Sequence, residues 1–433
     1  VMFRWRASSA WFLFILAVVG EEACAVPLVK ASVDETAAAS PVSKVSPIIL
    51  VPGIGGSVMV ERRTGMRVWI RFYEATFYFQ RFMWGKYNST TESMEPLPGQ
   101  PNTIPLLSGF GLDAIRNLDP DVKWPIYDYL VYFDGMIKVL EQQGWVAGQT
   151  LFGAPWDFRQ SMCWKPTLDM LTDKILNAYN INKRKVSLVT HSMGGLVTKC
   201  LLAKHPDIFE QYVEAWVSIA TPHQGSAGKI LLEFLQGYNL GNINVKPEDA
   251  KSLSLEAPSV YELLPQENYA WKQPPYTAMN MGGQRLVFAV DSTNATRYLV
   301  PLREACRSHS RLLPPDKTED LEPFNDELLE RSRGTRKLVA QAQLPPSVRF
   351  YNVYGVNEST PIGLEFGKIK AWSDLSHHKY VPTEGDGDGT VPVESATHHG
   401  FPERGTAAVA SKHLALVQQK ATIDVVLKAV RDT

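Results

Sequence analysis

The stretch that decides the fold, residues 186–204, reads VSLVTHSMGGLVTKCLLAK. Its first half is an apolar run typical of a buried strand and its second half is typical of a helix, so Ser192 falls on the sharp turn between them. Such a turn, a nucleophile elbow, lifts a serine oxygen clear of the backbone and within reach of a histidine base. Gly194 and Gly195 would let strand and helix approach closely, although Thr190 replaces the first glycine of the G-x-S-x-G pattern. We predict that Ser192 is a catalytic nucleophile; the alternative is an ordinary serine in a strand-to-helix loop.

Working outward, apolar runs alternate with segments of helical periodicity. Strands are expected at residues 48–51, 186–189, 216–219 and 348–354, and helices at residues 129–142, 168–179 and 414–430. Buried strands that alternate with helices indicate an α/β fold with a mostly parallel sheet flanked by helices on both faces.

Two long insertions interrupt this alternation. The first, about residues 61–108, is rich in aromatic residues, and we predict that it forms a lid over the site. Its candidate substrate contacts are Trp69, Phe72, Phe82 and Trp84. The second, about residues 230–345, is proline-rich and without clear strands, and is expected to form a cap. Aromatic residues are at least as common in cores as at lipid surfaces, so an ordinary packed subdomain is the alternative for the first insertion.

The charge balance limits the partners. The 433 residues have a formal net charge of −1 and contain no basic block, so nucleic-acid binding has no electrostatic support. The same balance argues against a strongly charged membrane-binding patch. Contact with lipid would therefore be mainly apolar.

The N-terminal segment has the features of a targeting signal. Two arginines precede an apolar run at residues 11–19, and residues 23–25 fit a cleavage site of small residues. We predict a signal peptide at residues 1–25 and entry into the secretory pathway, with a secreted or luminal (vacuolar or lysosomal) product; an uncleaved signal anchor is the alternative. Residues 26–46, rich in Ala, Ser and Val, are expected to be a disordered linker before a hydrolase domain at residues 47–433.

Other features are compatible with passage through the secretory pathway. Three N-x-S/T acceptor sites for N-glycosylation occur, at Asn88, Asn294 and Asn357. Cleavage of the signal would leave three cysteines, of which at most one pair could form a disulfide. Cys200 follows the elbow and is expected to be buried rather than bonded, while a pair of Cys163 with Cys306 stays open.

A serine nucleophile needs a base and an acid that orients it. The segment GDGDGTVP at residues 385–392 would form a tight loop that exposes a carboxylate, and Asp388 is preferred to Asp386 because it adjoins the Gly-Thr-Val return. The segment also looks like the start of a calcium loop. However, Ser395 stands where a bidentate glutamate is needed and Pro392 falls within the run of ligands, so no metal site is predicted.

The base must follow the acid if the chain order is Ser, Asp, His. His413 follows a plausible last strand at residues 407–410 and opens an amphipathic helix, which is the placement that a triad requires. His398 and His399 are the alternatives, and they are expected on a surface turn. His413 could instead merely cap the C-terminal helix.

Two backbone N–H groups would hold the oxyanion. One is that of Met193, directly after the nucleophile, and the other is that of Ile54 in the loop VPGIGGS at residues 51–57. Glycine-rich loops also bind phosphates, but no Lys-Ser/Thr pair follows this one, so a nucleotide site is disfavoured. No cofactor is expected.

Together these motifs resemble the lecithin:cholesterol acyltransferase (LCAT) family, and most of all its plant branch of LCAT-like phospholipases. The resemblance extends from about residue 47 to about residue 430. It is carried by ILVPG (49–53), RVW (67–69), LDPD (118–121), LFG (151–153), FRQS (158–161), HSMGG (191–195), KC (199–200), DIFE (207–210), LPP (344–346), FYNVYG (350–355) and DGDGTVP (386–392).

The resemblance implies an α/β-hydrolase fold and serine-dependent acyl transfer from glycerophospholipids, as a phospholipase A or a lipid O-acyltransferase. It assigns Ser192, Asp388 and His413 as the catalytic residues, and Ile54 and Met193 as the oxyanion donors. It implies a phospholipid partner at a membrane or lipid-particle surface and a water, lipid alcohol or sterol acceptor.

Two departures from the family and two alternative functions accompany this resemblance. Residues 62–102 contain no cysteine for the lid disulfide of animal members, and the Asp that those members favour near Ile54 is missing. A neutral-lipid esterase or lipase is the alternative enzyme. A non-catalytic lipid-binding homologue is the third reading.

Overall fold

The computed structural model describes residues 45–71, 78–119, 121, 130–237, 245–294, 296–307 and 324–431, which belong to one compact unit. The expected signal peptide and nearly all of the expected linker lie outside the described residues, as does Phe72.

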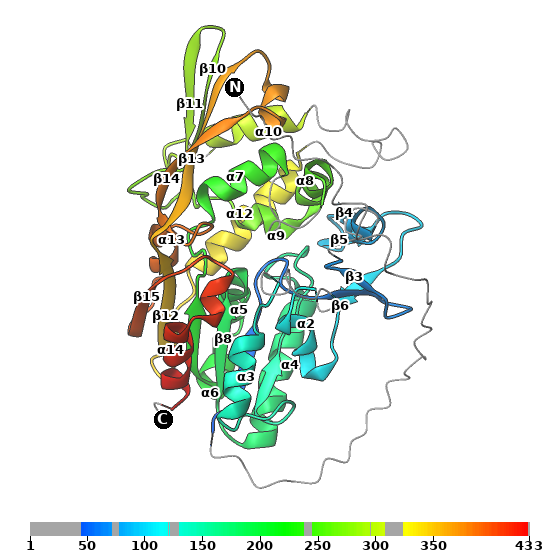
Figure 1. Cartoon of the computed structure of the whole chain (residues 1–433), viewed down its shortest axis with the longest axis vertical. Helices are drawn as coiled ribbons and strands as arrows, with labels where there is room; N and C mark the ends of the chain where they lie inside the picture. The colour runs from blue at the N-terminus through cyan, green and yellow to red at the C-terminus, as the bar shows by residue number, and fades with distance from the viewer. Residues whose placement is uncertain are drawn as a thin grey trace, which may run out of the picture. The chain divides into compact units, whose positions relative to one another are not determined.

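A six-stranded sheet forms the centre of the fold (Figure 1). Every neighbouring pair of its strands is parallel, which confirms the predicted α/β class. In spatial order its strands are β15 (Glu403–Ala410), β12 (Arg349–Val356), β9 (Val213–Ile219), β8 (Val186–His191), β1 (Ile48–Val51) and β7 (Leu151–Gly153).

The apolar runs form central strands because both faces of the sheet are covered. Ile49 belongs to one hydrophobic core, whereas its neighbours Ile48 and Leu50 belong to the other, as the alternation of side chains along a strand requires. Helices α4 (Lys165–Asn182), α5 (Met193–Lys204) and α6 (Pro206–Tyr212) contribute to the first core. The second core is built with α2 (Asp113–Arg116), α3 (Asp134–Gln142), the 3-10 turn η8 (Ala415–Gln418) and α14 (Lys420–Arg431).

Two of the three predicted helices lie close to where periodicity placed them, whereas the helix expected at residues 129–142 begins only at Asp134, as α3, and the described residues 130–133 before it are not helical. The helix expected at residues 168–179 extends three residues further at each end, as α4. The one expected at residues 414–430 is divided into η8 and α14.

The described part of the first insertion consists of short elements, most of them packed onto the first core. They are β2 (Met59–Glu61), β3 (Arg67–Trp69) and β6 (Thr103–Pro105) in one antiparallel sheet, the hairpin β4 (Gly85–Asn88) and β5 (Ser93–Pro96), the π-helix η2 (Phe79–Met83) and the 3-10 turn η3 (Gly109–Gly111).

The three described lid candidates are core residues in this structure. Trp69, Phe82 and Trp84 are each at most 5% exposed. The indole N–H of Trp69 donates to the carbonyl of Gly55, and that of Trp84 donates to the carbonyl of Asp249 in the second insertion. A lid role for this segment stays a prediction.

The second insertion contains strands, which corrects the expectation that it has none. Strands β10 (Tyr276–Met281) and β11 (Gln284–Ala289) form a hairpin around Gly282 and Gly283, and both glycines have positive φ angles. A Gly-Gly pair between two strand-like runs is a hairpin signal that the sequence offered. The helices in its described residues are α7 (Ala227–Gln236), α8 (Pro247–Glu256), α9 (Pro258–Glu262), α10 (Val300–Cys306), α12 (Asp326–Ala340) and the 3-10 turn η5 (Arg297–Leu299).

This hairpin joins two later strands in a second sheet of order β11-β10-β13-β14 (Figure 1). β13 (Glu358–Ile369) leads through the 3-10 turn η7 (Trp372–Ser376) to β14 (Tyr380–Gly387), which is followed by α13 (Val393–Thr397). Because β14 ends at Gly387, the second sheet delivers Asp388 beside the carboxyl ends of the central strands. No helix in the described ranges is both long enough and apolar enough to cross a membrane.

Candidate active site

Ser192 occupies the turn between β8 and α5 in a strained backbone conformation. Its φ of 54° and ψ of −131° lie outside the regions that residues with side chains ordinarily adopt. The Ser192 N–H donates to the carbonyl of Ile219 at 2.8 Å, which holds the turn against β9. A Cβ atom on Gly194 would lie 2.5 Å from the carbonyl oxygen of Pro52, so glycine is required there. This is the geometry of a nucleophile elbow.

The structure brings the three predicted side chains together. His413 lies on the loop between β15 and η8, and its Nε2 is 2.9 Å from Oγ of Ser192. Its Nδ1 is 2.7 Å from Oδ2 of Asp388. The Asp388 side chain is almost fully buried, and its second oxygen accepts the N–H groups of Thr390 and Val391. Every oxygen of this buried carboxylate is therefore paired, as burial of a charge requires.

This arrangement can activate a hydroxyl group. A carboxylate beside Nδ1 favours the imidazole tautomer that carries its proton there, which leaves Nε2 free to accept the proton of the Ser192 hydroxyl. The same carboxylate would stabilise the imidazolium that forms after that transfer.

The alternative acid and bases point elsewhere. Asp386 is exposed and accepts the N–H of Asn357. The His398 ring contacts the carbonyl of Glu394, and the His399 ring contacts the carboxylate of Glu403. None of these side chains contacts Ser192 by a hydrogen bond in the described part of the chain.

The two expected oxyanion donors flank the nucleophile. Met193 is the first residue of α5, and Ile54 lies in the turn that follows β1. Within the ranges that the structure describes, neither N–H donates a hydrogen bond to another group. A Cβ atom on Gly53 would lie 2.7 Å from Cβ of Ser192, so the loop that carries Ile54 packs directly on the nucleophile. The N-terminus of α5 adds a partial positive charge at this place.

The acceptor sites for glycosylation differ in exposure. Asn294 and Asn357 are exposed. Asn88 is half-buried and its amide group donates to the carboxylate of Glu95, so modification there would break a hydrogen bond.

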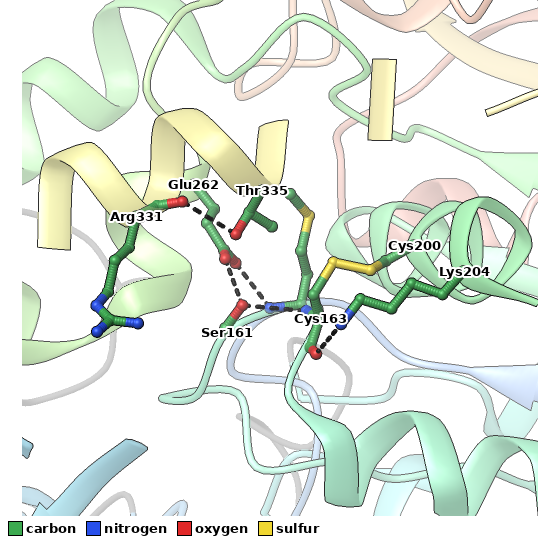
Figure 2. Close-up of a disulfide and its surroundings, with 8 residues drawn as sticks. Ser161, Cys163, Cys200, Lys204, Glu262, Arg331 and Thr335 are labelled. Carbon is green, nitrogen blue, oxygen red and sulfur yellow. Dashed lines mark hydrogen bonds between the residues drawn. A yellow bond between two sulfur atoms is a disulfide. The ribbon is translucent and has the colours of Figure 1, made fainter. Parts of the chain in front are cut away.

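Cys200 is buried, as expected, but the expectation that it is not bonded was wrong. Figure 2 shows Cys200 of α5 bonded to Cys163. The Cα atoms of the two cysteines are 5.6 Å apart. Cys306 is buried and its thiol is free. The disulfide forms because the segment before α4 packs on α5. The two cysteines are 37 residues apart, and this spacing alone does not predict the contact.

Two further features of the structure bear on ligands. No group of three or more His, Cys, Asp or Glu residues that could hold a metal occurs among the described residues. A pocket of about 470 Å³ opens beside β5, β6 and the segment that follows β7, and none of its lining residues is Ser192, Asp388 or His413. Its lining includes Met94, Thr103, Leu107, Trp156, Gln160 and Met170.

Comparison with known proteins agrees with this geometry. The family model for lecithin:cholesterol acyltransferase matches residues 67–409. "Lecithin-cholesterol acyltransferase-like 4" of Arabidopsis thaliana is 33% identical over 85% of this chain and 72% of its own length. "Phospholipase A(1) LCAT3" of the same plant is 32% identical over 88% of this chain and 89% of its own length. "Lysosomal phospholipase A and acyltransferase" of Homo sapiens is 27% identical over 72% of this chain and 66% of its own length.

Among solved structures, a chain of the Tle4–Tli4 complex superposes with a TM-score of 0.58 at 14% identity, covering 89% of this chain and 98% of that one. This likeness concerns the fold alone. The fold is that of the α/β-hydrolases, and the match of the family model over most of the sequence shows that the chain belongs to the lecithin:cholesterol acyltransferase family.

Proposed function

We propose that this protein transfers an acyl group from a glycerophospholipid through an acyl-serine intermediate, as a phospholipase A, a lipid O-acyltransferase or both. The observation that carries the proposal is the 2.9 Å contact between Oγ of Ser192 and Nε2 of His413, in a chain of this family. The choice of substrate is supported by relatives whose names are a phospholipase A(1) and a lysosomal phospholipase A and acyltransferase.

In the first half-reaction, Oγ of Ser192 attacks the ester carbonyl carbon while Nε2 of His413 takes the hydroxyl proton. The N–H groups of Ile54 and Met193 hold the oxyanion, and each such donor contributes roughly 3 kcal/mol to transition-state stabilisation. The ester C–O bond then breaks, and His413 returns the proton to the oxygen of the departing lysophospholipid.

In the second half-reaction, a hydroxyl group attacks the acyl-serine. His413 takes the proton of this acceptor and passes it to Oγ of Ser192 as the acyl bond to the enzyme breaks. Water as acceptor gives a fatty acid, whereas a lipid alcohol or sterol gives a new ester. The outcome depends on how well the site excludes water.

We also propose that the protein works in the secretory pathway, in peripheral contact with a phospholipid surface. A disulfide between Cys163 and Cys200 is typical of an oxidising compartment, and the exposed acceptor sites at Asn294 and Asn357 are compatible with it.

The test compares the purified protein with its Ser192→Ala variant. The wild type should react with a fluorophosphonate probe at Ser192 and release lysophospholipid from phosphatidylcholine, and the folded variant should do neither. Faster turnover of triglyceride than of phosphatidylcholine would favour a neutral-lipid lipase, and no reaction with the probe would favour a non-catalytic lipid-binding protein. Phosphatidylcholine labelled in both acyl chains, given with and without sterol, identifies the chain transferred and the acceptor.

A further inference from the structure

A buried series of hydrogen bonds connects the oxyanion loop, the nucleophile elbow and the base of the proposed site. The N–H of Gly53 donates to the hydroxyl oxygen of Tyr132 at 3.0 Å. That oxygen is 2.6 Å from Nδ1 of His191, and Nε2 of His191 is 3.1 Å from the carbonyl oxygen of His413. Tyr132 and His191 are at most 2% exposed. The series therefore runs without a break from the oxyanion loop to the base.

The residues in this hydrogen-bonded series are sequence neighbours of the reacting groups. Gly53 precedes Ile54, and His191 precedes Ser192, so each is one residue from an atom proposed to act on the substrate. His413 takes part through its backbone carbonyl, which leaves both ring nitrogens for Ser192 and Asp388. A shift of Tyr132 would therefore displace the oxyanion donor, the nucleophile and the base together.

The two ends of this series constrain the direction of the bonds in it. A backbone N–H can only donate and a carbonyl can only accept. Nε2 of His191 faces the carbonyl of His413 and must therefore donate to it, so in a neutral ring Nδ1 is an acceptor. The hydroxyl of Tyr132 then donates to Nδ1 while its oxygen accepts the N–H of Gly53. Because burial disfavours a charged ring, we assign His191 as a neutral imidazole with its proton on Nε2.

Protonation of His191 would break this arrangement. A second ring proton would face the Tyr132 oxygen, which already accepts from Gly53, and the hydroxyl proton would have to turn toward buried surroundings. The titratable groups that face this ring are Tyr132 from the segment before α3 and His413 from the loop after β15, with Asp388 behind His413. Burial lowers the pKa of His191 well below its ordinary value, and the nearby His413 lowers it further.

The charge of the His191 ring affects catalysis because the ring lies beside the proposed base. The centroids of the His191 and His413 rings are 4.7 Å apart. His413 must become an imidazolium during acyl transfer, and a second positive charge at that distance would oppose it.

We propose, on the basis of the function proposed above, that Tyr132 and His191 are positioning residues of the acyl-transfer site. They tie the oxyanion loop, the nucleophile elbow and the base together and keep an uncharged ring beside His413. Their effect is on turnover, because both side chains are buried and bonded within the protein.

The test uses Tyr132→Phe, which removes one oxygen atom and keeps the ring. The matched control is Tyr261→Phe, because the buried Tyr261 hydroxyl also accepts a backbone N–H, from Asn325, and donates to a carbonyl, of Leu255, away from the site. Both variants should lose a similar amount of thermal stability. With a soluble p-nitrophenyl ester, Tyr132→Phe should lower kcat about 10- to 100-fold with KM within about twofold, whereas the control should leave both near wild type.

The pH dependence distinguishes positioning from a general loss of packing. In Tyr132→Phe the neutral form of His191 loses the hydrogen bond that favours it, so the acid limb of kcat/KM should move to higher pH. The double variant Tyr132→Phe/His191→Gln has no ring to protonate, and its acid limb should return to the wild-type position. A Tyr132→Phe variant with wild-type kcat and pH profile, or a control with the same kinetic defect, would overturn the inference.

A measurement on the wild type keeps the inference testable if the variants do not fold. Nitrogen-15 NMR of histidine-labelled protein should show a His191 ring that stays neutral, with its proton on Nε2, at pH values below the ordinary pKa of histidine. A His191 ring that titrates near its ordinary pKa overturns the inference. If the wild type showed no fluorophosphonate labelling, the proposed function itself would be contradicted, and the inference that rests on it would fall with it.

Discussion

Asp388 and His413 are joined twice, by side chain and by backbone. Oδ2 of Asp388 lies 2.7 Å from Nδ1 of His413, and the N–H of His413 donates to the carbonyl of Asp388 at 2.8 Å. The loop after β14 thereby holds both the position of the histidine backbone and the rotation of its ring.

We expect Asp388→Asn to abolish nearly all turnover without loss of the fold. Oδ1 of residue 388 accepts the N–H groups of Thr390 and Val391, so the asparagine oxygen must stay there and its NH₂ group must face His413. Nδ1 of His413 then becomes an acceptor, and the ring proton moves to Nε2, where it blocks proton transfer from Ser192. The kcat for ester hydrolysis should fall by about 10³- to 10⁴-fold.

The control for this prediction is Asp386→Asn. Asp386 is exposed and accepts only the N–H of Asn357 among the described contacts, so this variant should keep wild-type kcat. Equal activity of the two variants would show that Asp388 does not orient the base.

A second prediction compares the effect on stability of replacing Gly194, at the elbow, with that of replacing Gly334, in α12. In Gly194→Ala the new Cβ would lie 2.5 Å from the carbonyl oxygen of Pro52 and 2.6 Å from that of Val51, and neither backbone atom can yield easily. We expect an unfolding free energy lower by about 1–3 kcal/mol and a large loss of activity. Denaturant titration and ester hydrolysis measure the two effects.

Gly334 is the opposite case. It lies within α12, and a Cβ atom there would meet nothing within 4 Å. Gly334→Ala should therefore raise the unfolding free energy by about 0.5–1 kcal/mol and leave activity unchanged. A Gly194→Ala variant as stable as Gly334→Ala would contradict the close packing inferred at Gly194.

Local sequence features predicted the parts of this molecule that depend on local structure. The apolar runs predicted the central strands, and the glycines around Ser192 indicated the turn that carries it. The order Ser, Asp, His helped to select Asp388 and His413, and the structure places His413 against Ser192 and Asp388 against His413; their catalytic roles stay predictions. The strands, the turn and the acidic loop were accessible because each depends on a few consecutive residues.

Features that depend on tertiary contact were not accessible in this way. Tyr132 and His191 are 59 residues apart, and nothing in either local sequence links them. Cys200 pairs with Cys163 because the segment before α4 packs on α5. The aromatic residues of the first insertion could belong to a lid or to a core, since composition is the same in both cases; the burial of Trp69, Phe82 and Trp84 appears only in the packed structure.

The disulfide should contribute substantially to stability. It closes a loop of 37 residues between Cys163 and Cys200, for which chain-entropy arguments give roughly 3–4 kcal/mol. The double variant Cys163→Ala/Cys200→Ala should unfold at a correspondingly lower denaturant concentration. Dithiothreitol should lower the stability of the wild type and leave that of the double variant unchanged.

Cys306→Ala is the control for the disulfide, because Cys306 is a buried free thiol. This variant should keep the sensitivity to dithiothreitol. A peptide map under non-reducing conditions should join Cys163 to Cys200, and a map that joins either of them to Cys306 would contradict the structure.

The last prediction concerns pH and stability. Glu262 is buried next to the disulfide, where its carboxylate accepts the hydroxyl of Ser161, as Figure 2 shows, and the N–H of Met162. Burial raises the pKa of Glu262 to about 7. The folded protein therefore binds one proton more than the unfolded chain between pH 4.5 and 7, and this residue stabilises the fold as the pH falls through that range. From pH 8 to pH 5.5 its contribution should rise by about 2 kcal/mol.

Buried histidines act in the opposite sense, so the effect must be measured as a difference. Burial lowers the pKa values of His191 and His223, and their contribution is lost as the pH falls below about 6.5. Glu262→Gln removes only the carboxylate, so the unfolding free energy of wild type minus variant should rise on acidification. The exposed control Glu248→Gln should give a flat difference. A flat difference for Glu262→Gln as well would mean that the Glu262 carboxylate is not destabilised by its burial.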